Sequence, residues 1–311
     1  MISVILPTHA PNAHRLARTL DGLRLQTWPR ECWELLIIDN ASPDPDIFKA
    51  HDLTWQARTR IIREERLGLT YARLAGIKAS QGEILVFVDD DNVLEAHYLL
   101  ETAQIFSHHP ELGAIGGKAL PEWETAPENW VHEFASCLAL RDWGDEGRLS
   151  DASRQEKAYP EFAPVGAGMA LRREAALRYA EIVSSQKSNA VSDRSGGNLS
   201  SGGDNDIVLT LAESGWKVGY FPQLRLTHLI PASRLTRSYL ARLNHGIARS
   251  WVEVLSRHGI RPWPRISSWT IPLRKFRAFW RYRPWRDAAS YVRWRGACGN
   301  LEGRASLSPE S

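Results

Sequence analysis

Cysteine is scarce in this 311-residue chain, with three residues far apart in the sequence: Cys32, Cys137 and Cys298. No two of them form a CxxC pair, so a zinc knuckle, a redox dithiol and a disulfide framework all lose support, and we expect a reducing compartment. Long hydrophobic runs are also missing, because the longest purely apolar runs span about five residues. The chain opens directly on an apolar stretch without a charged segment before it, so we expect neither a secretion signal nor a membrane-spanning helix.

Several common catalytic motifs are absent. The sequence has no GxxxxGK[ST] and no complete GxGxxG, GxSxG or HExxH, and the nearest match to the first is Gly117-Lys118-Ala119. Kinase, dehydrogenase and serine-hydrolase activities therefore have no motif to support them. Hydrophobic residues make up 43% of the chain and charged residues 24%, which excludes wholesale disorder and a polytopic membrane protein.

The net charge of +3 conceals a sharp asymmetry along the chain. Residues 1–230 carry 23 Lys and Arg against 32 Asp and Glu, whereas residues 231–311 carry 16 against four. The second segment also holds six of the thirteen tryptophans. We therefore expect two domains, a catalytic domain over 1–230 and a basic, Trp-rich helical extension over 231–311.

The first half of the chain alternates short apolar runs with helical periodicity, the pattern of βα units on a largely parallel sheet. Asn12 is placed to cap a helix whose Leu16, Leu20 and Leu23 share one face. The expected strands cover residues 2–6, 35–38, 84–88, 114–117 and 168–171, with weaker ones near 61 and 218–221. The expected helices cover residues 70–79 and 95–106, one from Asp204 to Gly215 and one from 235 to about 255, while the Ser- and Gly-rich residues 184–203 predict a loop.

Three successive carboxylates, Asp89, Asp90 and Asp91, stand where an apolar strand stops. The carboxyl ends of strands are where open α/β sheets bind ligands, and clustered oxygen ligands suit Mg²⁺ or Mn²⁺. The alternative is a solvated acidic turn. Acidic loops also close two other segments, at Asp39-Asn40 and at Gly203-Asp204-Asn205-Asp206, which favours the metal hypothesis.

Four blocks in order resemble the nucleotide-sugar-dependent glycosyltransferases of family 2, which have the GT-A fold. They are Ile2-Ser3-Val4-Ile5-Leu6-Pro7-Thr8, Leu36-Ile37-Ile38-Asp39-Asn40-Ala41-Ser42, Gly68-Leu69-Thr70-Tyr71-Ala72-Arg73 followed by the Phe87-Val88-Asp89-Asp90-Asp91-Asn92 strand end, and Gly203-Asp204-Asn205-Asp206. The resemblance covers about residues 1–240. It implies a GT-A-like, mostly parallel open α/β sheet flanked by helices, with the C-terminal helical extension beyond it.

The resemblance also implies roles for individual residues. Thr8 and Asp39 would contact the nucleoside, Asp89 would lie near the ribose, and Asp91 would ligate a metal that bridges the diphosphate. Arg66 and Arg73 either add positive charge near the diphosphate or pair with Glu64 or Glu65. The expected nucleotide-sugar contacts are Pro7, Thr8, Asp39, Asn40, Gly68, Arg73, Asp89 and Asp90. A cation at this place neutralises charge as the glycosidic bond breaks.

Asp204 is the residue that the resemblance makes the catalytic base, although the family usually has Glu-Asp in this block and Gly203 precedes it here. Asp206 is the alternative as base, metal contact or acceptor contact, or merely as a helix cap. A carboxylate can take the proton late in the reaction, and direct in-line attack implies inversion.

Other candidates come from the later part of the chain. His228 follows the last sheet strand, where family members place a histidine near the diphosphate or metal, and it is equally consistent with a structural histidine. Gly166-Ala167-Gly168-Met169 resembles the strand beneath the acceptor, or marks tight core packing. Trp123, Trp130 and Trp143 either stack on sugars or belong to the core.

The basic, Trp-rich extension leaves three interpretations open. Residues 273–283 mix cations with aromatic side chains, which suits an anionic membrane surface. A solvated helical pair that packs on the catalytic domain is the second interpretation. Nucleic-acid binding is the third, and no recognised module accompanies these charges, so we expect no nucleic acid partner.

These observations predict a metal-dependent inverting glycosyltransferase that uses a UDP-sugar with Mn²⁺ or Mg²⁺. The acceptor would be a sugar, a lipid-linked precursor or a surface-polysaccharide precursor, and the location cytoplasmic and peripheral on the inner face of the membrane. One alternative is a nucleotidyltransferase that makes nucleotide sugars, but it normally has a glycine-rich basic N-terminal loop, which Pro7-Thr8-His9-Ala10-Pro11-Asn12 lacks. The other is a non-catalytic sugar-binding or nucleic-acid-binding protein.

Overall fold

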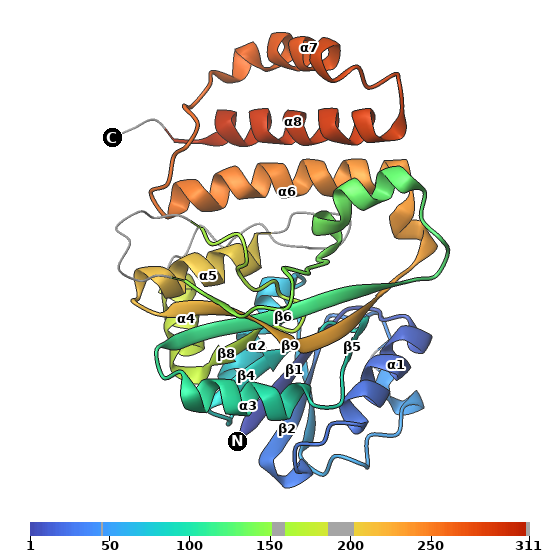
Figure 1. Cartoon of the computed structure of the whole chain (residues 1–311), viewed down its shortest axis with the longest axis vertical. Helices are drawn as coiled ribbons and strands as arrows, with labels where there is room; N and C mark the ends of the chain where they lie inside the picture. The colour runs from blue at the N-terminus through green and yellow to red at the C-terminus, as the bar shows by residue number, and fades with distance from the viewer. Residues whose placement is uncertain (45, 151–158, 186–201, 309–311) are drawn as a thin grey trace. The chain divides into compact units, whose positions relative to one another are not determined.

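The computed structural model describes residues 1–44, 46–150, 159–185 and 202–308 (Figure 1). The chain divides into two compact units. The first contains Met1–Glu122, the described part of Ala139–Ala190, and Ile207–Leu229. The second contains Trp123–Leu138, residues 202–206 and the described part of Ile230–Ser311. The predicted functional division at residue 230 stays a prediction.

The first unit begins with parallel strands. These are β1 (Ile2–Thr8), β2 (Trp33–Asn40), β3 (Thr59–Glu64) and β4 (Ile84–Phe87). β1 pairs in parallel with both β2 and β4, and β2 pairs in parallel with β3. The strand predictions for this half of the chain are therefore confirmed, including the weaker strand near Ile61.

The rest of the sheet is largely antiparallel. It consists of β5 (Asn92–Leu94), β6 (Leu112–Trp123), β7 (Arg148–Leu149), β8 (Ala170–Arg172) and β9 (Lys217–Ile230). The order across the sheet is β3-β2-β1-β4-β8-β6-β9-β5, and β7 pairs with β9. The open α/β sheet flanked by helices is thus confirmed, and its parallel part is confined to four strands.

Helices cover both faces of this sheet. α1 (Ala13–Arg24) and α3 (Tyr98–His108) pack on the face that holds Val4 and Leu6, while α2 (Leu69–Ala79), α4 (Arg173–Ser185) and the later part of α5 (Gly203–Glu213) pack on the face that holds Ile5. Because side chains alternate along a strand, β1 contributes to both cores. The Asn12 side chain caps α1 as expected, accepting a hydrogen bond from the amide of Arg15. Short 3-10 helices cover Arg30–Cys32, Ile47–Ala50, Asn129–Leu138, Ala232–Leu235 and Ser268–Thr270.

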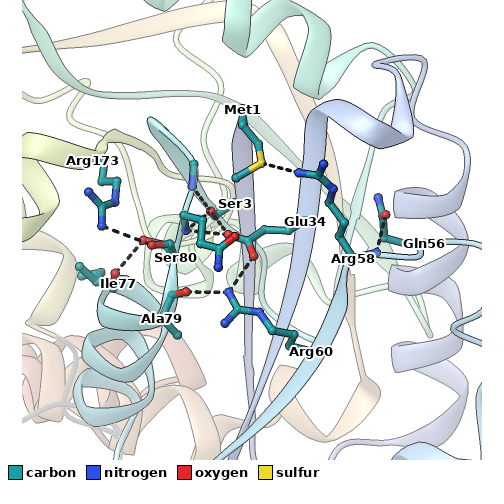
Figure 2. A network of polar contacts seen from close by, with 12 residues as sticks. Met1, Ser3, Glu34, Gln56, Arg58, Arg60, Ile77, Ala79, Ser80 and Arg173 are labelled. Carbon is teal, nitrogen blue, oxygen red and sulfur yellow. Dashed lines mark hydrogen bonds and ion pairs between the residues drawn. The ribbon is translucent and has the colours of Figure 1, made fainter.

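A polar network closes the amino-terminal edge of the parallel strands (Figure 2). The buried Glu34 carboxylate of β2 accepts hydrogen bonds from the Ser3 hydroxyl at 2.6 Å, the Gln81 amide at 2.7 Å and Arg60 Nη2 at 2.7 Å. Arg60 also donates to the Ala79 carbonyl at 2.6 Å. One carboxylate therefore joins β1, β2, β3 and the loop before β4.

The second unit is mainly helical. α6 (Arg237–Arg257) and α8 (Ala288–Ser306) pack together, and Figure 1 shows α8 running between α6 and α7 (Ile271–Tyr282). α8 approaches α6 through glycines: a Cβ on Gly299 would lie 2.1 Å from the His245 carbonyl oxygen. Among the described helices, none is both long enough and apolar enough to cross a membrane.

The helix predictions hold with shifted ends. The helix expected over 95–106 begins at Tyr98, and the one expected from 235 begins at Arg237. The helix that begins near Asp204 buries Ile207, Val208 and Leu211 as expected. Most of the predicted loop over residues 184–203 lies outside the described residues.

Candidate functional site

Polar residues gather at the carboxyl ends of three neighbouring strands, β2, β1 and β4. Thr8 ends β1 opposite Asp39 of β2, and Pro7, also buried, lies opposite Ile38. Residues 89–91 follow β4. The chain passes from β1 outward to β2 and β3 and then returns to β4 on the other side of β1, so this edge is the switch point where open α/β sheets bind ligands.

The Asp39 carboxylate is buried and held from two sides. Its Oδ1 accepts a hydrogen bond from the Ser42 amide at 3.0 Å, and its Oδ2 accepts one from Arg63 Nη1 at 2.5 Å. The hydrogen bond to Asp39 raises the pKa of Arg63. A carboxylate has about four acceptor positions, so two contacts leave capacity for a base N–H.

Asn40 organises the loop that follows β3. Its amide nitrogen donates to the carbonyls of Glu64 at 3.2 Å and Arg66 at 2.8 Å, and its Oδ1 accepts from the Gly68 amide at 2.7 Å. Gly68 has a φ of 143°, a conformation open to glycine and strained for other residues. Asn40 and Gly68 therefore have a structural role in this loop, and their predicted contact with the nucleotide sugar stays a prediction.

The two arginines of this region differ. Arg66 pairs with Glu64 at 2.8 Å, and this contact raises the pKa of Arg66. Arg73 is buried on α2, with its guanidinium 5.2 Å from the Phe87 ring and Nη2 3.9 Å from Asp89 Oδ1. Thus Arg66 takes the pairing alternative, whereas Arg73 lies beside the acidic triplet.

The three carboxylates after β4 have different surroundings. Asp89 keeps 30% of its side chain exposed. Asp90, partly buried, accepts a hydrogen bond from the Thr8 hydroxyl, which joins the ends of β1 and β4. Asp91 is buried, with an exposed fraction of 4%. A wholly solvated acidic turn does not describe this geometry.

Asp91 and His228 meet across an antiparallel ladder. β5 pairs with β9 so that Asn92 lies opposite His228, and the Leu229 amide donates to the Asp91 carbonyl at 2.9 Å. This register brings His228 Nε2 to 3.4 Å from Asp91 Oδ1, with both side chains buried. The two residues predicted from the sequence as metal ligands are therefore neighbours in the structure.

The residues present fit a metal that a bound diphosphate would help to coordinate. Among the described residues, no three His, Cys, Asp or Glu side chains form a group able to hold a metal by themselves. A hard cation of this kind is commonly held by one or two protein carboxylates together with substrate phosphates. Asn92 adds a fully buried Oδ1 that accepts no hydrogen bond from the described residues.

Asp204 and Asp206 belong to the first turn of α5, in the second unit. Asp206 is buried and pairs with His258 Nε2 at 3.1 Å and Arg257 Nη1 at 3.2 Å, both at the end of α6. Asp204 is partly exposed. Asp206 therefore anchors the start of α5 to the end of α6, and the catalytic role of Asp204 stays a prediction.

The acceptor candidates have packing roles in the structure. A Cβ on Gly168, at a φ of +75°, would lie 2.5 Å from Leu226 Cδ2, and the Gly168 carbonyl accepts a hydrogen bond from the Tyr98 hydroxyl at 2.5 Å. Trp123, Trp130 and Trp143 are partly buried. Tight packing therefore accounts for Gly168, and the acceptor role of all these residues stays a prediction.

Sequence reasoning missed Arg63 and Lys118. Arg63 stands opposite Asp39 in the β2–β3 ladder, a relation that the weak apolar pattern of β3 did not reveal. Lys118 of β6 is nearly buried, with Nζ 2.7 Å from Asp145 Oδ1 and 3.1 Å from Asp142 Oδ1. These two carboxylates raise the pKa of Lys118. Only the folded chain brings these charges together.

Residues 3–179, more than half of the chain, match the family model described as Glycosyl transferase family 2. The chain belongs to this family. The predicted resemblance, and with it a glycosyltransferase-type enzyme, is confirmed at the level of the family.

Two solved structures share the fold with this glycosyltransferase. Staphylococcus aureus TarS in complex with UDP-GlcNAc aligns over 98% of this chain and 90% of its own, with 14% identity and a TM-score of 0.53. The mannosyltransferase PcManGT of Pyrobaculum calidifontis, in complex with GDP-Man and Mn²⁺, aligns over 99% of this chain and 76% of its own, with 18% identity and a TM-score of 0.56. These likenesses confirm the GT-A fold.

Curated relatives match over shorter stretches. The glucosyl-dolichyl phosphate glucuronosyltransferase of Haloferax volcanii is 23% identical over 137 residues, which is 43% of this chain and 43% of that protein. The matches span less than half of the curated relatives' own lengths, with shares of 13%, 30% and 43% for three of them.

Proposed function

We propose that this glycosyltransferase moves a sugar from a UDP-sugar to an acceptor hydroxyl, with a divalent metal and with inversion at the anomeric carbon. One observation carries the proposal: the buried Asp91–His228 pair lies at the switch point, beside the Thr8–Asp90 hydrogen bond and the Asp39 carboxylate. An anionic diphosphate cannot be bound by carboxylates alone, since like charges repel. A nucleotide sugar together with a cation satisfies this arrangement.

Each residue has a part in this proposal. Asp39 accepts an N–H of the pyrimidine base, and Asp89 a ribose hydroxyl. Asp91 and His228 hold Mn²⁺ or Mg²⁺, which when bound neutralises charge on the departing diphosphate. Buried Arg73 beside Asp89 keeps a positive charge at the edge of the triplet.

Asp204 takes the acceptor proton. In one displacement the acceptor oxygen bonds to the anomeric carbon, the bond from that carbon to the phosphate oxygen breaks with its electron pair, and UDP departs. The support for Asp204 over Asp206 is exposure: Asp204 keeps part of its surface exposed, whereas Asp206 is buried against Arg257 and His258.

The acceptor class is the broadest part of the proposal. One relative acts on glucosyl-dolichyl phosphate by its name, and TarS is named a poly(ribitol-phosphate) β-N-acetylglucosaminyltransferase. We infer a lipid-linked or polysaccharide acceptor, and a location in the cytoplasm on the inner face of the membrane.

The test is release of UDP or GDP from UDP-Glc, UDP-Gal, UDP-GlcNAc, UDP-GlcA and GDP-Man, each with Mn²⁺ and with EDTA. We expect Mn²⁺-dependent release from a UDP-sugar, and a loss of at least about a hundredfold in Asp91→Asn. Asp21→Asn, an exposed carboxylate on α1, is the matched control. Unchanged activity in EDTA would contradict the metal role, and pyrophosphate release from UTP with a sugar phosphate would indicate a nucleotidyltransferase instead.

A further inference from the structure

Exposed large apolar side chains gather in one segment of the second unit. Trp269, Leu273, Phe276, Trp280 and Trp285 are 83%, 54%, 59%, 58% and 53% exposed. The other exposed large hydrophobic residues among those described are scattered through the first unit. Five such side chains within one helix and its flanks need an explanation, since single exposed apolar residues are ordinary but contiguous patches mark binding surfaces.

Their spacing places the side chains of α7 on one face. Leu273, Phe276 and Trp280 follow steps of three and four residues, and at about 100° per residue they fall within roughly 60° of arc, while Trp269 stands four residues before Leu273. Trp269 lies in the short 3-10 helix that leads directly into α7. We call this face the α7 apolar stripe.

A different face of α7 packs on α8. The Phe279 ring lies 5.6 Å from the Trp294 ring, and Lys275 Nζ lies 2.6 Å from Glu302 Oε1 of α8. None of the α7 residues is buried. The helix is therefore anchored by its inner face while the α7 apolar stripe stays uncovered in the second unit.

A basic row runs beside the stripe. Arg274, Arg277 and Arg281 are exposed, and the helical period puts them next to the stripe, on the side away from Phe279. Among the described residues, Arg277 and Arg281 have no ion pair with an acidic side chain. Residues 261–286 contain eight Lys and Arg and no Asp or Glu.

We propose that the α7 apolar stripe and its arginine row bind the surface of an anionic lipid bilayer. A helix lying in the interface buries an apolar face at the headgroup and acyl boundary while its cations meet the phosphates. Tryptophan is the residue that favours this depth. The biological role of this binding rests on the proposed function: it would bring the transferase to a lipid-linked acceptor.

The ring geometry favours a bilayer over nucleic acid. Trp280 packs edge to face with Phe276 at 6.1 Å and with Trp285 at 5.3 Å. Bases stack on ring faces that stand free, whereas these rings pack against one another as one apolar surface.

The experiment is co-sedimentation of the full chain with vesicles of phosphatidylcholine alone or with 30% phosphatidylglycerol, at low and high salt. We expect binding to the anionic vesicles only, and weakening with salt. F276S/W280S and R277Q/R281Q should each reduce the partition coefficient by about tenfold or more, because each cation near the surface and each interfacial ring contributes independently. L25S/R24Q, which changes one exposed apolar residue and one exposed cation at the end of α1, is the matched control and should bind like the wild type.

Several results would overturn the inference. Equal recovery in the supernatant with and without anionic vesicles would do so, as would equal binding to neutral vesicles. If both α7 variants bind vesicles like the wild type and have the same melting temperature, the membrane-binding surface is not the α7 apolar stripe. Binding of a single-stranded oligonucleotide without binding of vesicles would favour nucleic acid. A rise in the melting temperature of the same samples on addition of UDP and Mn²⁺ tests the proposed function separately.

Discussion

The surroundings of a carboxylate in this chain indicate its role. They distinguish candidates for catalysis or binding from carboxylates that stabilise the fold. Asp206 is enclosed by Arg257 and His258, Asp39 is held by Arg63 and the Ser42 amide, and Asp204 is partly exposed. Breaking a buried ion pair is costly because the remaining charge is left without compensation. Substitutions at Asp204 and Asp206 should therefore have opposite signatures.

Asp204→Asn should reduce transfer by roughly a hundredfold or more while donor binding and melting temperature persist, because the amide cannot accept the proton. Asp206→Asn should lower the free energy of unfolding by about 2–3 kcal/mol, because Arg257 and His258 lose their charged partner. Transfer rates and thermal melts on the same preparations check both. A large loss of transfer in Asp206→Asn at unchanged melting temperature, with a mild effect in Asp204→Asn, would identify Asp206 as the base.

The sequence reveals candidate residues where the signal is local and misses those that depend on the sheet. Thr8 and Asp39 stand at the carboxyl ends of apolar strands, and the 89–91 triplet follows another, so their place at a strand end is predictable. The neighbourhood of Asp91 and His228 depends on the β5–β9 register, which joins distant parts of the chain. Arg63 depends in the same way on the β2–β3 ladder. Such register is set by packing and not by local pattern.

At the scale of elements, the buried strands and capped helices are the predictable part. Asn12 and the leucine spacing define α1, and the apolar runs define β1 and β2. β6 and β9 run further than their apolar cores, because Gly116-Gly117-Lys118 and Pro222-Gln223 interrupt the pattern but not the strand. A Cβ on Gly117 would lie 2.0 Å from the Leu224 carbonyl oxygen, so close approach of the two strands requires this glycine.

The network around Glu34 predicts an acid-dependent loss of stability. Burial by itself would raise the pKa of Glu34, but hydrogen bonds from Ser3, Gln81 and Arg60 outweigh burial and hold it below its ordinary value. A carboxylate with a lowered folded-state pKa stabilises the fold above the unfolded-chain pKa, and this contribution is lost as the pH falls through the folded-state pKa. Glu34→Gln should therefore lower the melting temperature by about 5 °C at pH 7, and the difference from the wild type should shrink toward pH 3.

Thermal melts between pH 3 and pH 8 measure this effect. Glu31→Gln, an exposed acid of the 3-10 helix just before β2, is the control and should follow the wild type at each pH. A Glu34→Gln difference that stays constant across the range would show that packing, and not the charge, is what the substitution removes.

The contact between α6 and α8 predicts a second effect on stability. A methyl group at residue 299 would meet the His245 backbone at 2.1 Å, so Gly299→Ala should force the helices apart and cost about 1–3 kcal/mol. Gly147→Ala is the control, since the nearest atom to its added Cβ is 3.7 Å away. Chemical denaturation of both variants checks the prediction. Equal stabilities would mean that α8 shifts without loss.

At the scale of the whole molecule, the change in charge at residue 230 is a property of the sequence composition. The two compact units, in contrast, are defined by contacts between residues. The second unit takes residues 123–138 and 202–206 as well as the tail. Within it, Glu133 pairs with Arg293 of α8, and Asp206 pairs with the end of α6. These long-range ion pairs cannot be predicted from the pattern of charge along the sequence.

A chain that ends at residue 230 should therefore fail to form a stable protein. It would leave the buried Asp206 carboxylate without Arg257 and His258, and the 3-10 helix Asn129–Leu138 without the salt bridge from Arg293. The loss of these ion pairs, and of the α6 and α8 packing to which they belong, removes a large share of the stability of an ordinary domain. We expect aggregation or a broad, non-cooperative melt by circular dichroism.

The full chain with F276S/W280S is the matched control, because those side chains are exposed, and it should melt cooperatively like the wild type. A 1–230 protein with a sharp transition near that of the full chain, stabilised by UDP and Mn²⁺, would instead show that the first 230 residues fold and bind the nucleotide without the helical extension.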